Sequence, residues 1–96
     1  MIQLEPSELA IIKTIVKQYL PGKEICIFGS RTTSTYKPYS DVDLCVMGEE
    51  PLTLRQMAEL REAFSESRLS MRVDVVDWAS TTSEFRSIIQ SQAVKI

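Results

Sequence analysis

The chain has 96 residues, two cysteines and no histidine, and 11 lysine and arginine residues against 13 aspartate and glutamate residues give a formal charge of −2. This length is typical of a single small domain, and we expect one, 1–96. The missing histidine excludes Ser-His-Asp and Cys-His catalysis and zinc sites with histidine ligands. Because the basic residues form no patch, we expect no stable binding of nucleic acid.

Hydrophobic periodicity predicts helices that alternate with strands along the chain. The expected order is a helix from Ser7 to the Pro21-Gly22 stop, a strand at 24–28, at most a turn or two of helix and then a loop at 30–40, a strand at 41–47, a helix at 53–67, a strand at 71–76 and a last helix at 80–92. This alternation is typical of a small α/β domain with helices packed on a three- to four-stranded sheet. The pattern leaves the order and sense of the strands open.

Several side chains have an expected environment. Residues expected on the buried side of the helix at 53–67 are Leu54, Met57, Ala58, Leu60, Arg61 and Phe64. Cys26 and Cys45 lie in apolar runs, as buried strand thiols do. The chain shows no signal-peptide pattern and no apolar stretch of about 20 residues, so we expect no membrane segment and a cytoplasmic location.

Polar residues cluster where the predicted strands begin and end. Gly29-Ser30-Arg31 follows the first strand, where a glycine, the amides of a helix start, a hydroxyl and a guanidinium suit a phosphate group. Asp41 and Asp43 alternate on one strand and therefore share a face. Two like charges on one face need a cation or a salt-bridge partner.

Asp74 is the third acid, in a run of β-branched residues on the next strand. If that strand lies beside the second, Asp74 completes a carboxylate cluster with Asp41 and Asp43. Such hard oxygen ligands select Mg²⁺ or Mn²⁺, and two ions would suit phosphoryl transfer. Asp77 has the opposite parity and is expected to be a solvated or capping residue at the strand end.

The sequence Phe28-Gly29-Ser30-Arg31, followed by Asp41-Val42-Asp43-Leu44 and later by Val73-Asp74-Val75, resembles the signature of the DNA polymerase β-type nucleotidyltransferase superfamily. The short chain is similar to the minimal nucleotidyltransferase (MNT) branch, whose members are antitoxins paired with HEPN-domain toxins. The resemblance covers nearly the whole chain. It implies a small mixed sheet packed with helices, the polymerase β-like nucleotidyltransferase fold.

The resemblance also implies an enzyme that transfers AMP from ATP to a protein hydroxyl, a tyrosine of a HEPN-domain RNase toxin encoded nearby. Asp41, Asp43 and Asp74 would be catalytic and hold two Mg²⁺ ions, with Asp74 serving the ion at the acceptor oxygen. Gly29, Ser30 and Arg31 would bind the triphosphate. An oligomer in the toxin complex is left open.

One departure from the resemblance motivates other hypotheses. Relatives commonly continue Gly-Ser-Arg with Ala-Arg-Gly, whereas this chain has Thr32, Thr33 and Ser34. A non-catalytic antitoxin or adaptor that neutralises its partner by binding alone is the alternative. Apolar residues at Ile88, Ile89, Val94 and Ile96 would then meet another chain or simply cover the sheet. A nucleotide-sensing module is a third hypothesis.

Overall fold

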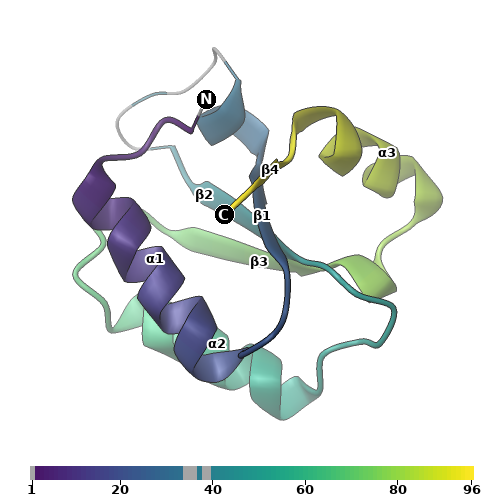
Figure 1. Cartoon of the computed structure of the whole chain (residues 1–96), viewed down its shortest axis with the longest axis horizontal. Helices are drawn as coiled ribbons and strands as arrows, with labels where there is room; N and C mark the ends of the chain where they lie inside the picture. Colours follow the sequence, from purple (N-terminus) through teal and green to yellow (C-terminus); the bar gives the residue numbers. More distant parts are fainter. Residues whose placement is uncertain (1, 34–36, 38–39) are drawn as a thin grey trace.

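A computed structural model describes residues 2–33, 37 and 40–96 (Figure 1). Its elements are α1 (Pro6–Tyr19), β1 (Ile25–Phe28), the 3₁₀ turn η1 (Gly29–Thr32), β2 (Val42–Val46), α2 (Leu54–Ser65), β3 (Val73–Asp77), a second 3₁₀ turn η2 (Trp78–Ser80), α3 (Ser83–Gln92) and β4 (Val94–Lys95). The expected α/β class is therefore confirmed. Of the segment expected as a short helix and loop at 30–40, residues 34–36 and 38–39 lie outside the described residues.

Local capping sets where the helices begin. The Glu5 amide donates a hydrogen bond of 2.9 Å to Oε1 of Glu8, which closes a capping box at the start of α1. Thr53 and Gln56 form the same motif before α2. At α3 the hydroxyl of Thr82 accepts a bond from the amide of Phe85. These caps place the starts of α1 and α3 within a few residues of their predicted positions.

The described strands form one mixed, four-stranded sheet in the order β3-β2-β1-β4. β1 runs antiparallel to β2 and to β4, whereas β2 and β3 are parallel. The parallel pair follows from α2, because a helical crossover returns the chain to the same end of the sheet. β4 has two residues and was not predicted.

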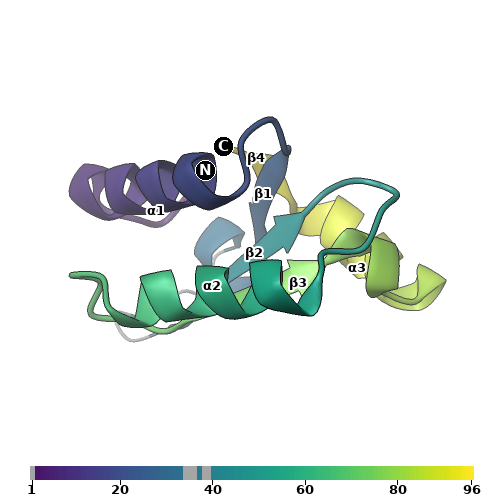
Figure 2. The same cartoon turned by 90° about the horizontal axis from the view of Figure 1, so that it is seen from below.

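Each face of the sheet has its own apolar cluster. Figure 2 shows α1 and α2 together on one side of the strands and α3 on the other. The larger cluster joins α1 and α2 to alternate strand residues, among them Ile27, Val42, Leu44 and Val75. Cys45 belongs to the smaller cluster, under α3. The second strand therefore has the predicted alternation, with its aspartates on the face that α3 only partly covers.

Three predicted environments in α2 are wrong, while Leu60 and Phe64 are buried as expected. Leu54 is 91% exposed, and Ala58 and Arg61 are also exposed. Leu54 is the first residue of the helix, whereas the α2 residues that pack in the larger core are Met57, Leu60 and Phe64. The described residues contain no helix long and apolar enough to cross a bilayer.

The apolar C-terminal residues divide between packing and exposure. Ile89 is buried in the cluster under α3, and Ile96 packs against the larger core. Ile88 remains 50% exposed on α3. The two cysteines are free and face each other across β1 and β2, buried as expected. Burial raises the pKa of the Cys45 thiol to about 11, as for an unreactive structural thiol.

Candidate active site

Gly29 forms the sharp exit from β1 into η1. Its φ of +81° lies in the left-handed region that favours glycine. A Cβ at this position would also collide with the Asp43 carboxylate, which lies opposite Phe28 on β2. The sequence thus needs a glycine here for two independent reasons, and the turn lies directly against the acidic face.

The amide of Gly29 already has a protein partner. It donates a hydrogen bond of 2.9 Å to Oε1 of Gln92, the last residue of α3. The predicted phosphate cradle therefore has one of its expected amides bonded to a side chain, which pins the turn to α3. Nothing in the sequence pattern singles out Gln92, since a glutamine at a helix end has no distinctive spacing.

The altered stretch after Arg31 closes the 3₁₀ turn with its own hydroxyls. Oγ1 of Thr32 donates to the carbonyl of Gly29 at 3.0 Å, and Oγ1 of Thr33 donates to the carbonyl of Ser30 at 3.4 Å. Ser30 is half-buried in the same turn. Ser34 lies outside the described residues. The threonines thus bond the turn locally, where the family pattern has an alanine and a basic residue.

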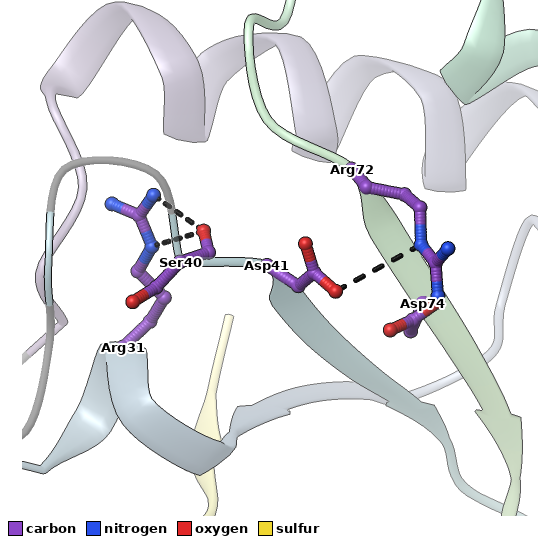
Figure 3. Close-up of polar contacts among 5 residues, drawn as sticks. All are labelled: Arg31, Ser40, Asp41, Arg72 and Asp74. Carbon is purple, nitrogen blue, oxygen red and sulfur yellow. Dashed lines mark hydrogen bonds and ion pairs between the residues drawn. The ribbon is translucent and has the colours of Figure 1, made fainter.

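Arg31 is a buried clamp at the edge of the site, with 2% of its surface exposed. Figure 3 shows its guanidinium on the backbone carbonyl of Ser40, which accepts bonds from Nε at 3.2 Å and Nη2 at 2.7 Å. Nη1 donates to the carbonyl of Gln3 at 2.9 Å. Since Ser40 directly precedes Asp41, the clamp fixes the chain where it enters the acidic face.

The three predicted acids lie on one face of two neighbouring strands. Asp43 and Asp74 are register partners in the parallel pair β2 and β3. Asp41 lies two residues before Asp43 and shares its face. Parallel neighbours are about 4.8 Å apart across the sheet, so the carboxylates of Asp43 and Asp74 are close. The structure thus brings together the residues that the sequence separates by 31 positions.

The electrostatics of this face are those of crowded like charges. Burial, reinforced by the charges of Asp74 and Asp41, raises the pKa of Asp43 to about 6. One positively charged side chain already offsets part of this negative charge. Arg72 forms ion pairs with Asp74 (Nη2 to Oδ1, 3.1 Å) and with Asp41 (Nε to Oδ2, 3.8 Å) (Figure 3).

The donor set fits a hard divalent cation in its chemistry. Three carboxylates share one face, and the raised pKa of Asp43 means that a further positive charge there would be stabilising. As the side chains stand, no three metal-ligating residues of the described ranges converge on one point, and two of the carboxylates are paired with Arg72. The backbone places the three acids next to one another, since Asp43 and Asp74 are register partners and Asp41 lies two residues before Asp43.

Asp77 has the capping role expected for it. Its Oδ2 accepts a bond of 2.8 Å from the amide of Leu52 and one of 3.2 Å from Oγ of Ser80. It therefore ties the loop before α2 to the end of β3, away from the other acids. Arg72 was not among the predicted site residues, although its parity with Asp74 on one strand was a signal.

Three acids on adjacent strands beside a glycine turn are an arrangement that suits phosphoryl transfer, and the comparisons with known proteins place the chain in a class of this kind. The family model described as "Nucleotidyltransferase domain" matches residues 9–96. The chain belongs to this nucleotidyltransferase family, as its motifs predict.

Two kinds of relative refine this membership. The chain is 46% identical over 95 residues to the "Probable protein adenylyltransferase MntA" of Haemophilus influenzae strain Rd, covering 99% of this chain and 83% of the relative. Its fold is similar to a chain in the crystal structure of a toxin-antitoxin with AMP-PNP, with a TM-score of 0.76, 25% identity, and coverage of 90% of this chain and 69% of the other.

A second solved structure shares the fold. It is the structure of a tri-AMPylated Shewanella oneidensis HEPN toxin in complex with an MNT antitoxin. One chain of that structure matches this chain with a TM-score of 0.66 and 24% identity, and the match covers 92% of this chain and 69% of the other. The minimal nucleotidyltransferase architecture expected from the motifs is confirmed by these similarities.

Proposed function

We propose that this chain transfers AMP from ATP to a tyrosine hydroxyl of a HEPN-domain RNase toxin and thereby acts as the antitoxin of the pair. The observation that carries the proposal is the register of Asp43 with Asp74, with Asp41 on the same face and the Gly29 turn packed against Asp43. The relative named as a protein adenylyltransferase supports the reaction, and the toxin-antitoxin structures support the partner.

Asp41 and Asp43 would hold two Mg²⁺ ions, or Mn²⁺ in their place, and Asp74 would serve the ion nearest the acceptor. Once bound, these ions would neutralise the phosphate charge and activate the acceptor oxygen. The chain has no histidine, and this chemistry needs none, since positioning and charge neutralisation dominate nucleotidyl transfer.

The reaction itself is a single displacement at phosphorus. The acceptor oxygen forms a bond to the α-phosphorus of ATP, the bond from that phosphorus to the β-phosphate oxygen breaks, and pyrophosphate leaves. The Asp74 carboxylate, 40% exposed, takes the hydroxyl proton and passes it to solvent. The low barrier comes from holding acceptor and triphosphate in line rather than from a covalent intermediate.

Gly29 and Ser30 would receive the triphosphate, since glycine allows close approach of the backbone. That Arg31 binds phosphate directly stays a prediction, and its contacts favour a positioning role. By holding the carbonyls of Ser40 and Gln3, the guanidinium keeps Asp41 at the entrance of β2.

The reaction belongs in the cytoplasm, where ATP is abundant and thiols stay reduced. Cys26 and Cys45 are opposite each other across β1 and β2, and both are free. The proposed compartment predicts that these two thiols stay reduced in the cell.

A non-catalytic antitoxin is the second candidate, and the exposed apolar residues of α3 favour it. Ile88 is 50% exposed and Phe85 is 36% exposed, which would suit a binding surface. Neutralisation of the toxin in cells tests both candidates with the double change Asp41→Ala and Asp43→Ala. Loss of neutralisation by a stably folded variant supports catalysis, whereas full neutralisation contradicts it and supports binding alone.

A further inference from the structure

Arg72 lies between two of the three acids of the site. Its Nη2 is 3.1 Å from Oδ1 of Asp74, and its Nε is 3.8 Å from Oδ2 of Asp41 (Figure 3). One guanidinium therefore bridges carboxylates that come from different strands. These are the same two strands whose pairing builds the acidic face.

The pairing of the two strands brings the residues of this bridge together. The carbonyl of Arg72 accepts a bond of 2.9 Å from the amide of Val42, which extends the parallel ladder by one step beyond β3. Arg72 and Asp74 alternate on one strand and so share a face. The same step brings Arg72 opposite Asp41. Sheet register thus places Arg72 next to Asp41 and Asp74 on one face, within reach of both carboxylates.

The ion pairs of Arg72 with the two acids can break readily. The Arg72 side chain is 74% exposed, so water and salt compete for its guanidinium, and exposed ion pairs of this kind are weak. Arg72 also lines a cavity of about 500 Å³ beside Asp74, together with Arg61, Phe64 and Met71. Asp74 lines the same cavity, so the guanidinium has open space directly beside the ion pair into which it can move.

We propose that Arg72 is the internal counter-ion of the acidic site, which pairs with Asp41 and Asp74 until a divalent cation binds them. This inference rests on the metal assignment in the proposed function. Arg72 is a positioning residue: its guanidinium holds one oxygen of Asp41 and one of Asp74 on either side of itself, and it lowers the affinity of the site for cations by competing for these oxygens. On cation binding its guanidinium turns away toward the cavity.

The change Arg72→Gln tests the competition, because it removes the charge and keeps a polar side chain. Mn²⁺ affinity, measured by electron paramagnetic resonance without ATP or partner, should become roughly threefold to tenfold tighter. Arg72→Lys, which keeps the charge, should remain near the parent value. Arg55→Gln is the matched control, since it removes the same charge from an exposed ion pair with Glu59 on α2.

An affinity of Arg72→Gln equal to or weaker than that of the parent overturns the inference and leaves the metal site standing. Absence of saturable Mn²⁺ binding in the parent and all variants contradicts the metal assignment itself, and the inference falls with it. A second measurement needs no folded variant of the site. In the parent protein, the Nε–H resonance of Arg72 should shift saturably as Mg²⁺ is added, while that of Arg55 stays fixed. An unmoved Arg72 resonance under saturating Mg²⁺ overturns the inference.

Discussion

Gly29 lies directly against the carboxylate of Asp43, so that a Cβ on the glycine would overlap Oδ2 of the aspartate. This contact joins the turn after β1 to the acidic face of β2. It links the two motifs that define the site, the Gly-Ser-Arg turn and the paired aspartates, within a single packing relationship.

The change Gly29→Ala should therefore lower the free energy of unfolding by more than the left-handed backbone conformation alone would. Gly22 has the same φ of +81°, and a Cβ added there would meet nothing within 4 Å, which makes Gly22→Ala the matched control. We expect a loss of about 1 kcal/mol in the free energy of unfolding for Gly22→Ala, from the left-handed backbone. Gly29→Ala should lose roughly 1–3 kcal/mol more, from the collision with Asp43, and should lower AMP transfer. Urea denaturation measures both, and equal losses would contradict the contact.

The stability of the metal-free protein should fall as the pH rises from about 4 to about 6. The pKa of Asp43 is about 6 in the fold, against 3.8 for the ordinary carboxyl group. Between these values the native state binds a proton that the unfolded state has released, so raising the pH favours unfolding. Thermal melts across this range measure the trend.

Asp43→Asn supplies the control, because an amide does not ionise. We expect this variant to have a free energy of unfolding about 1–3 kcal/mol higher than that of the parent at about pH 7.5, and to lose the decline between about pH 4 and 6. Such a gain in stability with loss of transfer is typical of an active-site charge. A variant as pH-sensitive as the parent would show that another group titrates.

The affinity for a metal ion should rise with pH, whereas the stability of the metal-free protein falls. A cation binds the ionised carboxylate, so Mn²⁺ affinity should fall as the pH drops through about 6, where Asp43 takes up a proton. Higher Mn²⁺ concentration should move the midpoint to lower pH, because the cation competes with the proton. If the midpoint pH stays the same at every Mn²⁺ concentration, the group that titrates does not belong to the metal site.

Arg31→Lys should destabilise the fold by about 2–4 kcal/mol, since a lysine cannot reach both carbonyls that the buried guanidinium serves. Arg55→Lys, at an exposed position on α2, should change stability by less than about 0.5 kcal/mol. Denaturant titration compares the two. A stable Arg31→Lys protein with weaker ATP binding would instead favour direct phosphate contact.

Much of the architecture follows from patterns that the sequence displays locally. The alternation of Val42, Leu44 and Val46 with aspartates predicted both faces of β2, because strand parity depends only on neighbouring residues. The exposure of Leu54 was not predicted, since a helix has no internal sign of where its partner surface ends. β4 was missed because two residues carry too little periodicity to mark a strand.

The acidic residues of the site could be predicted from the sequence, whereas the residues that contact the site through long-range pairs could not. Asp41, Asp43 and Asp74 carry a motif, whereas the contacts of Arg72 depend on which strand lies beside β2, and that is a tertiary fact. The same holds for Gln92, whose bond to Gly29 spans 63 positions. Long-range contacts between common polar residues leave no periodic trace in the sequence.

The most direct test of the proposed function follows the α-phosphate of ATP. The purified chain is incubated with Mg²⁺, the HEPN toxin encoded nearby, and ATP labelled at either the α- or the γ-phosphorus. We expect α-label and no γ-label on the toxin, transfer unchanged in the control Glu62→Gln on the exposed side of α2, and no transfer with Asp41→Asn and Asp43→Asn combined. Label from the γ-phosphate, or equal α-labelling by the double variant, would contradict the proposed reaction.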